Sequence, residues 1–255
     1  MRPLALALPL ALAACSATDG GTAAEHVARA RAHAVAASQG SFLAGPGHAL
    51  RMRAELERAT VLDPASVEAR TELARFYLAA PRLLGGGRAR AAEQIAALER
   101  LAPARAAVLE GWRQHHAGAP RAAERELRRA VALAPDSAAA WFALAHVLRD
   151  AERNDGAVAA LQRGLALRPD FMPGHWALGL IGATTGTHLA EAERALLVYL
   201  RTKPAKSEPP LATAHYRLGM VYEKQGRVDL ARREYEAALK ERPSAEYREA
   251  LERVR

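Results

Sequence analysis

The sequence predicts an all-α fold of stacked antiparallel helix hairpins, on the basis of its proline spacing, a repeated segment and its apolar content. Six prolines are separated by 39, 32, 34, 35 and 39 residues, namely Pro64, Pro103, Pro135, Pro169, Pro204 and Pro243. The segments HWALG, from His175, and HYRLG, from His215, are visibly copies. A period near 34 residues is typical of a two-helix unit whose apolar face is buried only when neighbouring units stack. Half of the residues are apolar, which is enough for a continuous core.

The most complete unit lies between His215 and Pro243. Its patterned positions carry Leu218, Gly219, Tyr222, Gly226, Ala231, Tyr235 and Ala238, and Pro243 follows them. These residues and their spacing resemble one tetratricopeptide repeat. The resemblance implies a tetratricopeptide α-solenoid, in which helix-turn-helix units form a right-handed superhelix with a concave surface suited to holding a partner.

On this pattern the repeat region covers residues 25–255. We expect about six units, at 25–65, 66–103, 104–137, 138–171, 172–206 and 211–243. The segment 245–255 alternates charged residues with Tyr247, Leu251 and Val254, as is typical of a terminal capping helix with a polar outer face. About thirteen helices and no sheet are therefore predicted.

The units match the repeat pattern to different degrees. Close packing explains why they carry similar residues at the same positions. Small residues at the eighth and twentieth positions let two helices approach, and proline ends the second helix because it has no amide hydrogen. The first unit fits mainly in its second helix, through Met52, Leu56 and Ala59. That unit is the weakest match, and the third unit carries Glu110 and Gln114 where leucine and an aromatic residue are expected.

An insertion of five residues, including Gly85 to Gly87, separates the halves of the second unit. If these glycines, with Arg88 and Arg90, lie at the start of a helix, the backbone amides there are able to bind an anion. The alternative is a lengthened loop whose turns the glycines permit. The segment lacks the lysine and hydroxyl residue of a phosphate-binding loop and follows no strand, which favours the loop.

The first fifteen residues differ from the rest of the chain. Arg2 precedes a short apolar run over residues 4–13, and Leu-Ala-Ala-Cys ends at Cys15. This resembles a bacterial lipoprotein signal, which implies removal of residues 1–14, lipid on Cys15 and a flexible tether over 15–24. Ser16 after the cysteine favours, by the same resemblance, an outer membrane lipoprotein facing the periplasm. The alternative is an ordinary secretory signal with a chance cysteine. The apolar run is about half of the roughly 20 residues that a spanning helix needs, so no transmembrane helix is expected.

Tetratricopeptide proteins place the fifth, ninth, twelfth and thirteenth positions of each first helix on the concave face. By this resemblance, Phe142, Trp176 and Tyr216 would form an aromatic ladder along a partner-binding groove. The alternative is that these rings pack between units, because aromatic residues at helical spacing are usually core. The other positions carry Trp112, His115, His116, His146, Arg149, Asp150, Met220, Glu223 and Lys224.

The sequence offers no motif for catalysis or for a cofactor. His115 and His116 are adjacent, so on a helix they point about 100° apart and do not easily bind one ion together. No cysteine or carboxylate partner is fixed beside them by the sequence. We therefore expect no metal site and no cofactor. Because nothing resembles a nucleophile, base and oxyanion site, we also expect no enzyme.

These observations together predict a lipid-anchored periplasmic scaffold that binds a protein or peptide segment, in cell-envelope assembly. The alternative is a small-ligand binding component associated with a solute transporter, with the aromatic residues lining a cavity. The net charge of +8 is compatible with acidic partners and also with an ordinary soluble protein. Nucleic acid is not expected as a partner, and the sequence predicts no particular oligomeric state.

Overall fold

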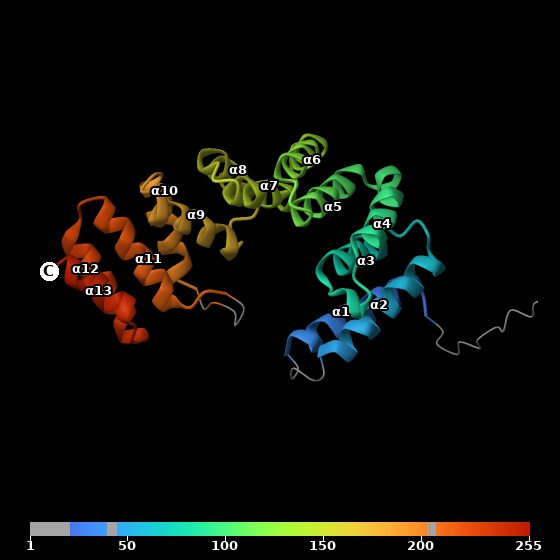
Figure 1. Ribbon diagram of the computed structural model, residues 1–255, viewed down its shortest axis with the longest axis horizontal. Helices are drawn as coiled ribbons and strands as arrows, with labels where there is room; N and C mark the ends of the chain where they lie inside the picture. Colours follow the sequence, from blue (N-terminus) through green and yellow to red (C-terminus); the bar gives the residue numbers. More distant parts are fainter. Residues whose placement is uncertain (1–20, 40–44, 203, 205–207) are drawn as a thin grey trace, which may run out of the picture. The chain divides into compact units, whose positions relative to one another are not determined.

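The computed structural model describes residues 21–39, 45–202, 204 and 208–255. These residues form thirteen α-helices and one short 3-10 helix, without any strand (Figure 1). The predicted all-α fold is thus confirmed. None of the described helices combines the length and apolarity needed to cross a membrane. The expected signal segment, Cys15 and the first part of the tether lie outside the described residues.

The chain forms two compact units, which meet in sequence after Ala69. Unit 1 contains a hairpin of two helices and the start of a third, which are α1 (Ala23–Gln39), α2 (Gly45–Leu62) and α3 (Val67–Ala79). Unit 2 holds the rest of α3 and ten further α-helices. They are α4 (Arg88–Leu101), α5 (Pro103–His116), α6 (Pro120–Leu133), α7 (Ala138–Asp150), α8 (Asn154–Leu167), α9 (Met172–Thr185), α10 (Leu189–Leu200), α11 (Leu211–Lys224), α12 (Val228–Glu241) and α13 (Ala245–Arg253).

The hairpin of unit 1 is joined by apolar and polar contacts. Leu56 and Ala59 of α2 are completely buried, as their positions in the repeat pattern predict. His26 of α1 is also buried, and its Nδ1 lies 2.6 Å from Glu55 Oε2 of α2. Arg29 Nε donates to the same carboxylate oxygen at 3.1 Å. A partly buried carboxylate with two such partners ties α1 to α2.

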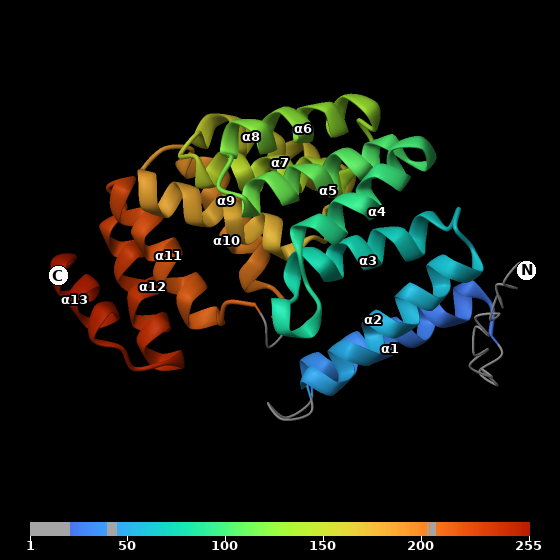
Figure 2. The same cartoon turned by 45° about the vertical axis from the view of Figure 1, so that its right-hand side comes forward.

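Unit 2 is a stack of helix hairpins. Helices α5–α6, α7–α8, α9–α10 and α11–α12 pair in succession, and α13 packs on α12 at the C-terminus. The first helices also contact each other across hairpins, α5 with α7 and α9 with α11. Helices α6 and α8 lie along one side of unit 2, and α5 and α7 lie along the other (Figure 2). This order of helix pairs is that of a tetratricopeptide α-solenoid.

Five of the six prolines lie two residues beyond a second helix, as predicted, whereas Pro204 lies four residues beyond the end of α10. Pro135, Pro169 and Pro243 each lie two residues beyond the last residue of α6, α8 and α12. Pro64 and Pro103 have the same position after α2 and α4, and Pro103 also begins α5. Proline is suited to both places because it cannot donate within a helix but fits its first turn.

The turns of the last four hairpins share a position with a positive φ angle, and the α9–α10 turn has a second one at His188. Gly118, Gly186 and Gly226 take this place in three hairpins, with φ of 74°, 78° and 75°. In the α7–α8 hairpin the equivalent residue is Glu152, with φ of 57°. A side chain in this left-handed region costs about 1 kcal/mol relative to glycine. The repeated glycine is therefore explained by backbone geometry.

Close approach of two helices explains a second repeated glycine. Gly111, Gly179 and Gly219 occupy the same position of α5, α9 and α11. A Cβ atom there would lie 2.6 Å, 2.4 Å and 2.4 Å from the facing side chains, which are Leu127, Leu196 and Tyr235. These three facing side chains are completely buried in their second helices. The absence of a Cβ thus lets each pair of helices pack at short distance.

The insertion between α3 and α4 is a loop whose backbone amides form hydrogen bonds within the chain. It forms a 3-10 helix over Arg82–Leu84, after which Gly85 adopts a φ of 89°. The amide of Gly86 donates to Pro81 O and the amide of Gly87 donates to Tyr77 O. The interpretation of these glycines as an anion-binding loop is therefore wrong, because their amides are already bonded to carbonyl groups within the chain.

Replacing Gly219 by alanine should destabilise unit 2. The added methyl group meets the Tyr235 ring, which is completely buried. We expect the free energy of unfolding to fall by about 1–3 kcal/mol, measured by urea unfolding followed by circular dichroism. Gly87→Ala is the control, because a Cβ at Gly87 contacts nothing within 4 Å. Equal stability of the two variants would contradict this packing.

Candidate partner-binding surface

The structure places Tyr216 in the core of the last two hairpins. Only 6% of this residue is exposed. Its ring stacks on Tyr247 of α13 with centroids 4.8 Å apart, and it also contacts Tyr235 of α12 at 5.8 Å. The prediction that Tyr216 lines a binding groove is therefore wrong. The capping helix supplies the ring that covers it.

The other two rings of the expected ladder also pack against aromatic neighbours. Phe142 of α7 stacks on Phe171, which precedes α9, with centroids 4.2 Å apart. Trp176 of α9 contacts Tyr199 of α10 at 5.5 Å. Both rings remain partly exposed and belong to the periphery of the core. Phe142 thus packs between α7 and the start of α9, and Trp176 packs within the α9–α10 hairpin, while their place in a binding groove stays a prediction.

Among the other candidate residues of α11, Glu223 is the one that bonds to the C-terminal helices. Tyr235 OH of α12 donates to Glu223 Oε2 at 2.5 Å, and Arg253 of α13 pairs with Glu223 at 3.4 Å. Burial disfavours the Glu223 carboxylate, but hydrogen bonds from Tyr235 and Arg253 outweigh it and lower the pKa of Glu223. Met220 Sδ accepts from Arg217 at 3.3 Å. Lys224 is exposed at the end of α11.

The remaining six candidates lie together on α5 and α7. We call them the α5–α7 surface, which consists of Trp112, His115 and His116 of α5 and His146, Arg149 and Asp150 of α7. Each helix contributes residues at spacings of three and four, which fall on one helix face. The structure therefore brings together half of the predicted groove residues.

Aromatic rings form the centre of the α5–α7 surface. The Trp112 ring lies 5.0 Å from the His146 ring, across the two hairpins. It also contacts His115 at 5.8 Å and His116 at 6.1 Å, measured between ring centroids. Trp112 is partly buried against the core, whereas His116 is exposed. One indole thus supports three imidazoles on a partly exposed surface.

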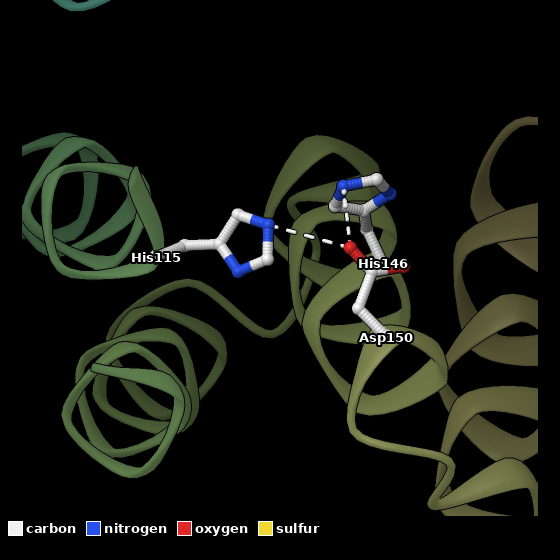
Figure 3. A group of neighbouring side chains, drawn as sticks. All are labelled: His115, His146 and Asp150. Carbon is white, nitrogen blue, oxygen red and sulfur yellow. Dashed lines mark ion pairs between the residues drawn. The ribbon is translucent and has the colours of Figure 1, made fainter. Parts of the chain in front are cut away.

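Asp150 is the only carboxylate among these six residues. Its Oδ2 lies 3.3 Å from both His115 Nε2 and His146 Nε2 (Figure 3). Arg149 Nη2 donates to Asp150 Oδ1 at 2.8 Å and lies 2.9 Å from His146 Nδ1. The surface therefore presents one negative charge surrounded by a guanidinium and two imidazoles.

The pKa values of this surface follow from burial and charge. Burial lowers the pKa of His146, and Arg149 adds to this effect, while Asp150 opposes it. Burial also lowers the pKa of His116, together with the nearby His115. For Asp150, burial favours the neutral acid, but the hydrogen bond from Arg149 and the nearby histidines outweigh it and lower the pKa. Near neutral pH, His146 is therefore uncharged beside an ionised Asp150.

The combination of His115 with His146 and Asp150 was not anticipated from the sequence. Only the adjacent pair His115 and His116 was considered there, and no carboxylate partner was apparent. The signal that could have found it is the repeat itself, because Asp150 lies one period of 34 residues after His116. Equivalent positions of stacked repeats become neighbours in space.

A separate hollow of about 660 Å³ lies over α6, α7 and α8. Its lining includes Trp141, Leu144 and Arg163. It contains none of the residues predicted to line a groove. The hollow and the α5–α7 surface are thus formed by different residues of α7.

Sequence comparison agrees with the repeats seen in the structure. Family models of the tetratricopeptide repeat match residues 114–178 and 212–245. With the helix stack of unit 2, these matches, which cover less than half of the chain, support a tetratricopeptide-repeat protein. No curated protein sequence matches it.

Solved structures with the same fold include YrrB, a tetratricopeptide protein described as having an unusual peptide-binding site. It is 18% identical, with a TM-score of 0.59, over 77% of this chain and 96% of YrrB. PilW, described as a widely conserved type IV pilus biogenesis factor, is 19% identical, with a TM-score of 0.58, over 88% and 97% of the chains. The Pseudomonas aeruginosa protein pilF is 15% identical, with a TM-score of 0.61, over 89% and 97%. At these identities the similarity is one of fold.

Changing the charges around His146 should shift its titration in opposite directions. Asp150→Asn removes the charge that favours the imidazolium, so the pKa of His146 should fall further. Arg149→Gln removes an opposing positive charge, so the same pKa should rise. Titration of the histidine ring signals by NMR measures both shifts. A His146 in the unchanged chain that titrates above the ordinary histidine value would contradict this environment.

Proposed function

We propose that this chain is a lipid-anchored scaffold in the periplasm, held at the outer membrane through Cys15. In this proposal the α5–α7 surface binds a segment of a protein that takes part in cell-envelope assembly. The proposal combines two parts that are tested separately, the binding surface and the anchor.

The observation that carries the binding part is the composition of the α5–α7 surface. It joins an indole, three imidazoles, a guanidinium and a carboxylate from two neighbouring hairpins. Tryptophan and arginine are the residues most often found at the energetic centre of protein interfaces. Partly exposed rings beside paired charges also match the mixed character of such interfaces. A protein segment with aromatic and charged side chains would find complementary groups there.

The comparisons support a binding role by analogy. Tetratricopeptide domains generally bind protein or peptide partners, and YrrB is described by its peptide-binding site. PilW is described as a pilus biogenesis factor, which agrees with a role in building structures of the cell envelope. The partner segment proposed here is accordingly part of an envelope protein.

The anchor part rests on the first fifteen residues. Cys15 is the only cysteine of the chain and ends a sequence of the lipoprotein type. Stable membrane attachment needs more than one acyl chain, because a single chain binds only marginally. The proposal therefore requires a multiply acylated Cys15 at the start of the mature chain.

A small-ligand role is less well supported by the placement of the rings. That role would need Phe142, Trp176 and Tyr216 to line a common cavity. Each of them instead packs against a ring of a neighbouring element. The placement of the rings therefore favours binding of a protein segment over binding of a small ligand.

Arg149→Glu should weaken partner binding at least about tenfold, which corresponds to about 1.4 kcal/mol. The change removes the guanidinium and places a second negative charge beside Asp150. The partner is first identified by mild crosslinking and mass spectrometry, and its affinity is then measured with purified proteins. Arg125→Glu on α6 is the matched control, because Arg125 is exposed and lies outside the α5–α7 surface. Equal weakening by both variants would contradict the assignment of this surface.

Cys15→Ser should move the protein from the membrane fraction to the soluble periplasmic fraction. Without the thiol there is no site for acylation, so nothing holds the folded repeats at the membrane. Cell fractionation, together with mass spectrometry of the N-terminal peptide, measures the change. An unmodified Cys15 in the unchanged chain, or equal membrane association of both forms, would contradict the anchor.

A further inference from the structure

We infer that His115, His146 and Asp150 form a binding site for a divalent transition metal ion, with Zn²⁺ as the principal candidate. Each side chain offers one ligand atom, and these atoms all lie within 4.8 Å of one another (Figure 3). The site joins α5 to α7 and so links two hairpins of unit 2. The three ligands also belong to the α5–α7 surface, but all of them come from this chain, so metal binding is tested without a partner.

The distances between the donor atoms suit a small tetrahedral ion. With Zn²⁺ bonds of about 2.0–2.1 Å, neighbouring ligand atoms lie about 3.3–3.4 Å apart. Asp150 Oδ2 is already 3.3 Å from His115 Nε2 and 3.3 Å from His146 Nε2. The two nitrogens lie within 4.8 Å of each other, so at most about 1.5 Å of side-chain adjustment completes the triangle.

Helix geometry holds two of the three ligands in place. His146 and Asp150 are four residues apart on α7, which puts them one turn apart on the same face. His115 approaches from the last turn of α5, which contacts α7 directly. Two imidazoles with one carboxylate are a donor set that Zn²⁺ and other first-row divalent ions accept.

The site is accessible to an ion from solvent. The side chains of His115, His146 and Asp150 are 22%, 36% and 36% exposed, so an ion can reach them. Three protein ligands leave a fourth tetrahedral position for water.

Arg149 is the group that opposes the binding of a metal ion at this site. Its Nη2 lies 2.9 Å from His146 Nδ1, which must accept this hydrogen bond. When His146 Nε2 binds a metal, Nδ1 carries the proton and no longer accepts, so Arg149 has to release it. Arg149 keeps its bond to Asp150 Oδ1, the oxygen that does not face the ion. Removal of the guanidinium should therefore strengthen metal binding.

The remaining neighbours define the controls. His116 lies beside His115, with ring centroids 6.0 Å apart, but it is outside the set of three donors. His33 and His48 of unit 1 form another histidine pair, with Nδ1 atoms 3.3 Å apart. Both are possible sources of nonspecific binding, so each is tested by its own variant.

The test is calorimetric titration of the full chain with Zn²⁺, in a Cys15→Ser background and without a histidine tag. We expect one ion per chain, and His115→Gln, His146→Gln and Asp150→Asn should each weaken binding at least about tenfold. His116→Gln and His48→Gln should change the affinity less than about threefold, and Arg149→Gln should bind several-fold more tightly. Circular dichroism confirms that each variant keeps its helicity.

A second readout uses Trp112, whose ring lies 5.0 Å from the His146 ring. Co²⁺ bound at the site should quench indole fluorescence, Trp112→Phe should remove this quenching, and Trp141→Phe should retain it. The inference is overturned if Zn²⁺ does not saturate the chain up to millimolar concentration. It is equally overturned if the three ligand variants bind as the unchanged chain does, or if His116→Gln or His48→Gln abolishes binding.

Discussion

The short distance between the two helices of each hairpin is the constraint on which the rest of the structure depends. In α5, α9 and α11 a glycine faces a completely buried leucine or tyrosine of the second helix. This contact fixes how the first helix is rotated about its axis. Because Gly111 faces α6, Trp112, which is the next residue and lies about 100° further round α5, turns toward the neighbouring first helix and meets His146. Buried Ala145 has the equivalent position in α7, one residue before His146.

Because the hairpins stack in register, side chains at equivalent positions of successive first helices come together on one surface. Trp112 and His146 occupy equivalent positions one period of 34 residues apart, and so do His116 and Asp150. When α5 packs on α7, these positions become neighbours without any long-range motif in the sequence. The same contact therefore joins two hairpins of unit 2 and carries the chemistry proposed for them. A change that shifts α5 along α7 would alter both.

The sequence predicts the helices well because proline, glycine and apolar spacing act locally. Pro135, Pro169 and Pro243 lie where the second helices end, since proline lacks the donor that a continuing helix needs. Whether a single aromatic ring is buried or exposed is not decided by the local sequence. Tyr216 is buried because Tyr247 of the capping helix stacks on it, and no repeat position encodes that partner. His115 meets Asp150 for the same reason, through a contact between separate hairpins.

The register of α5 against α7 is the central claim, and NMR measures it directly in solution. Nuclear Overhauser contacts between the ring protons of Trp112 and His146 report whether these residues face each other. The account predicts strong contacts, because the ring centroids lie 5.0 Å apart. Trp112 contacts to a different part of α7, or none to His146 in the folded chain, would contradict it.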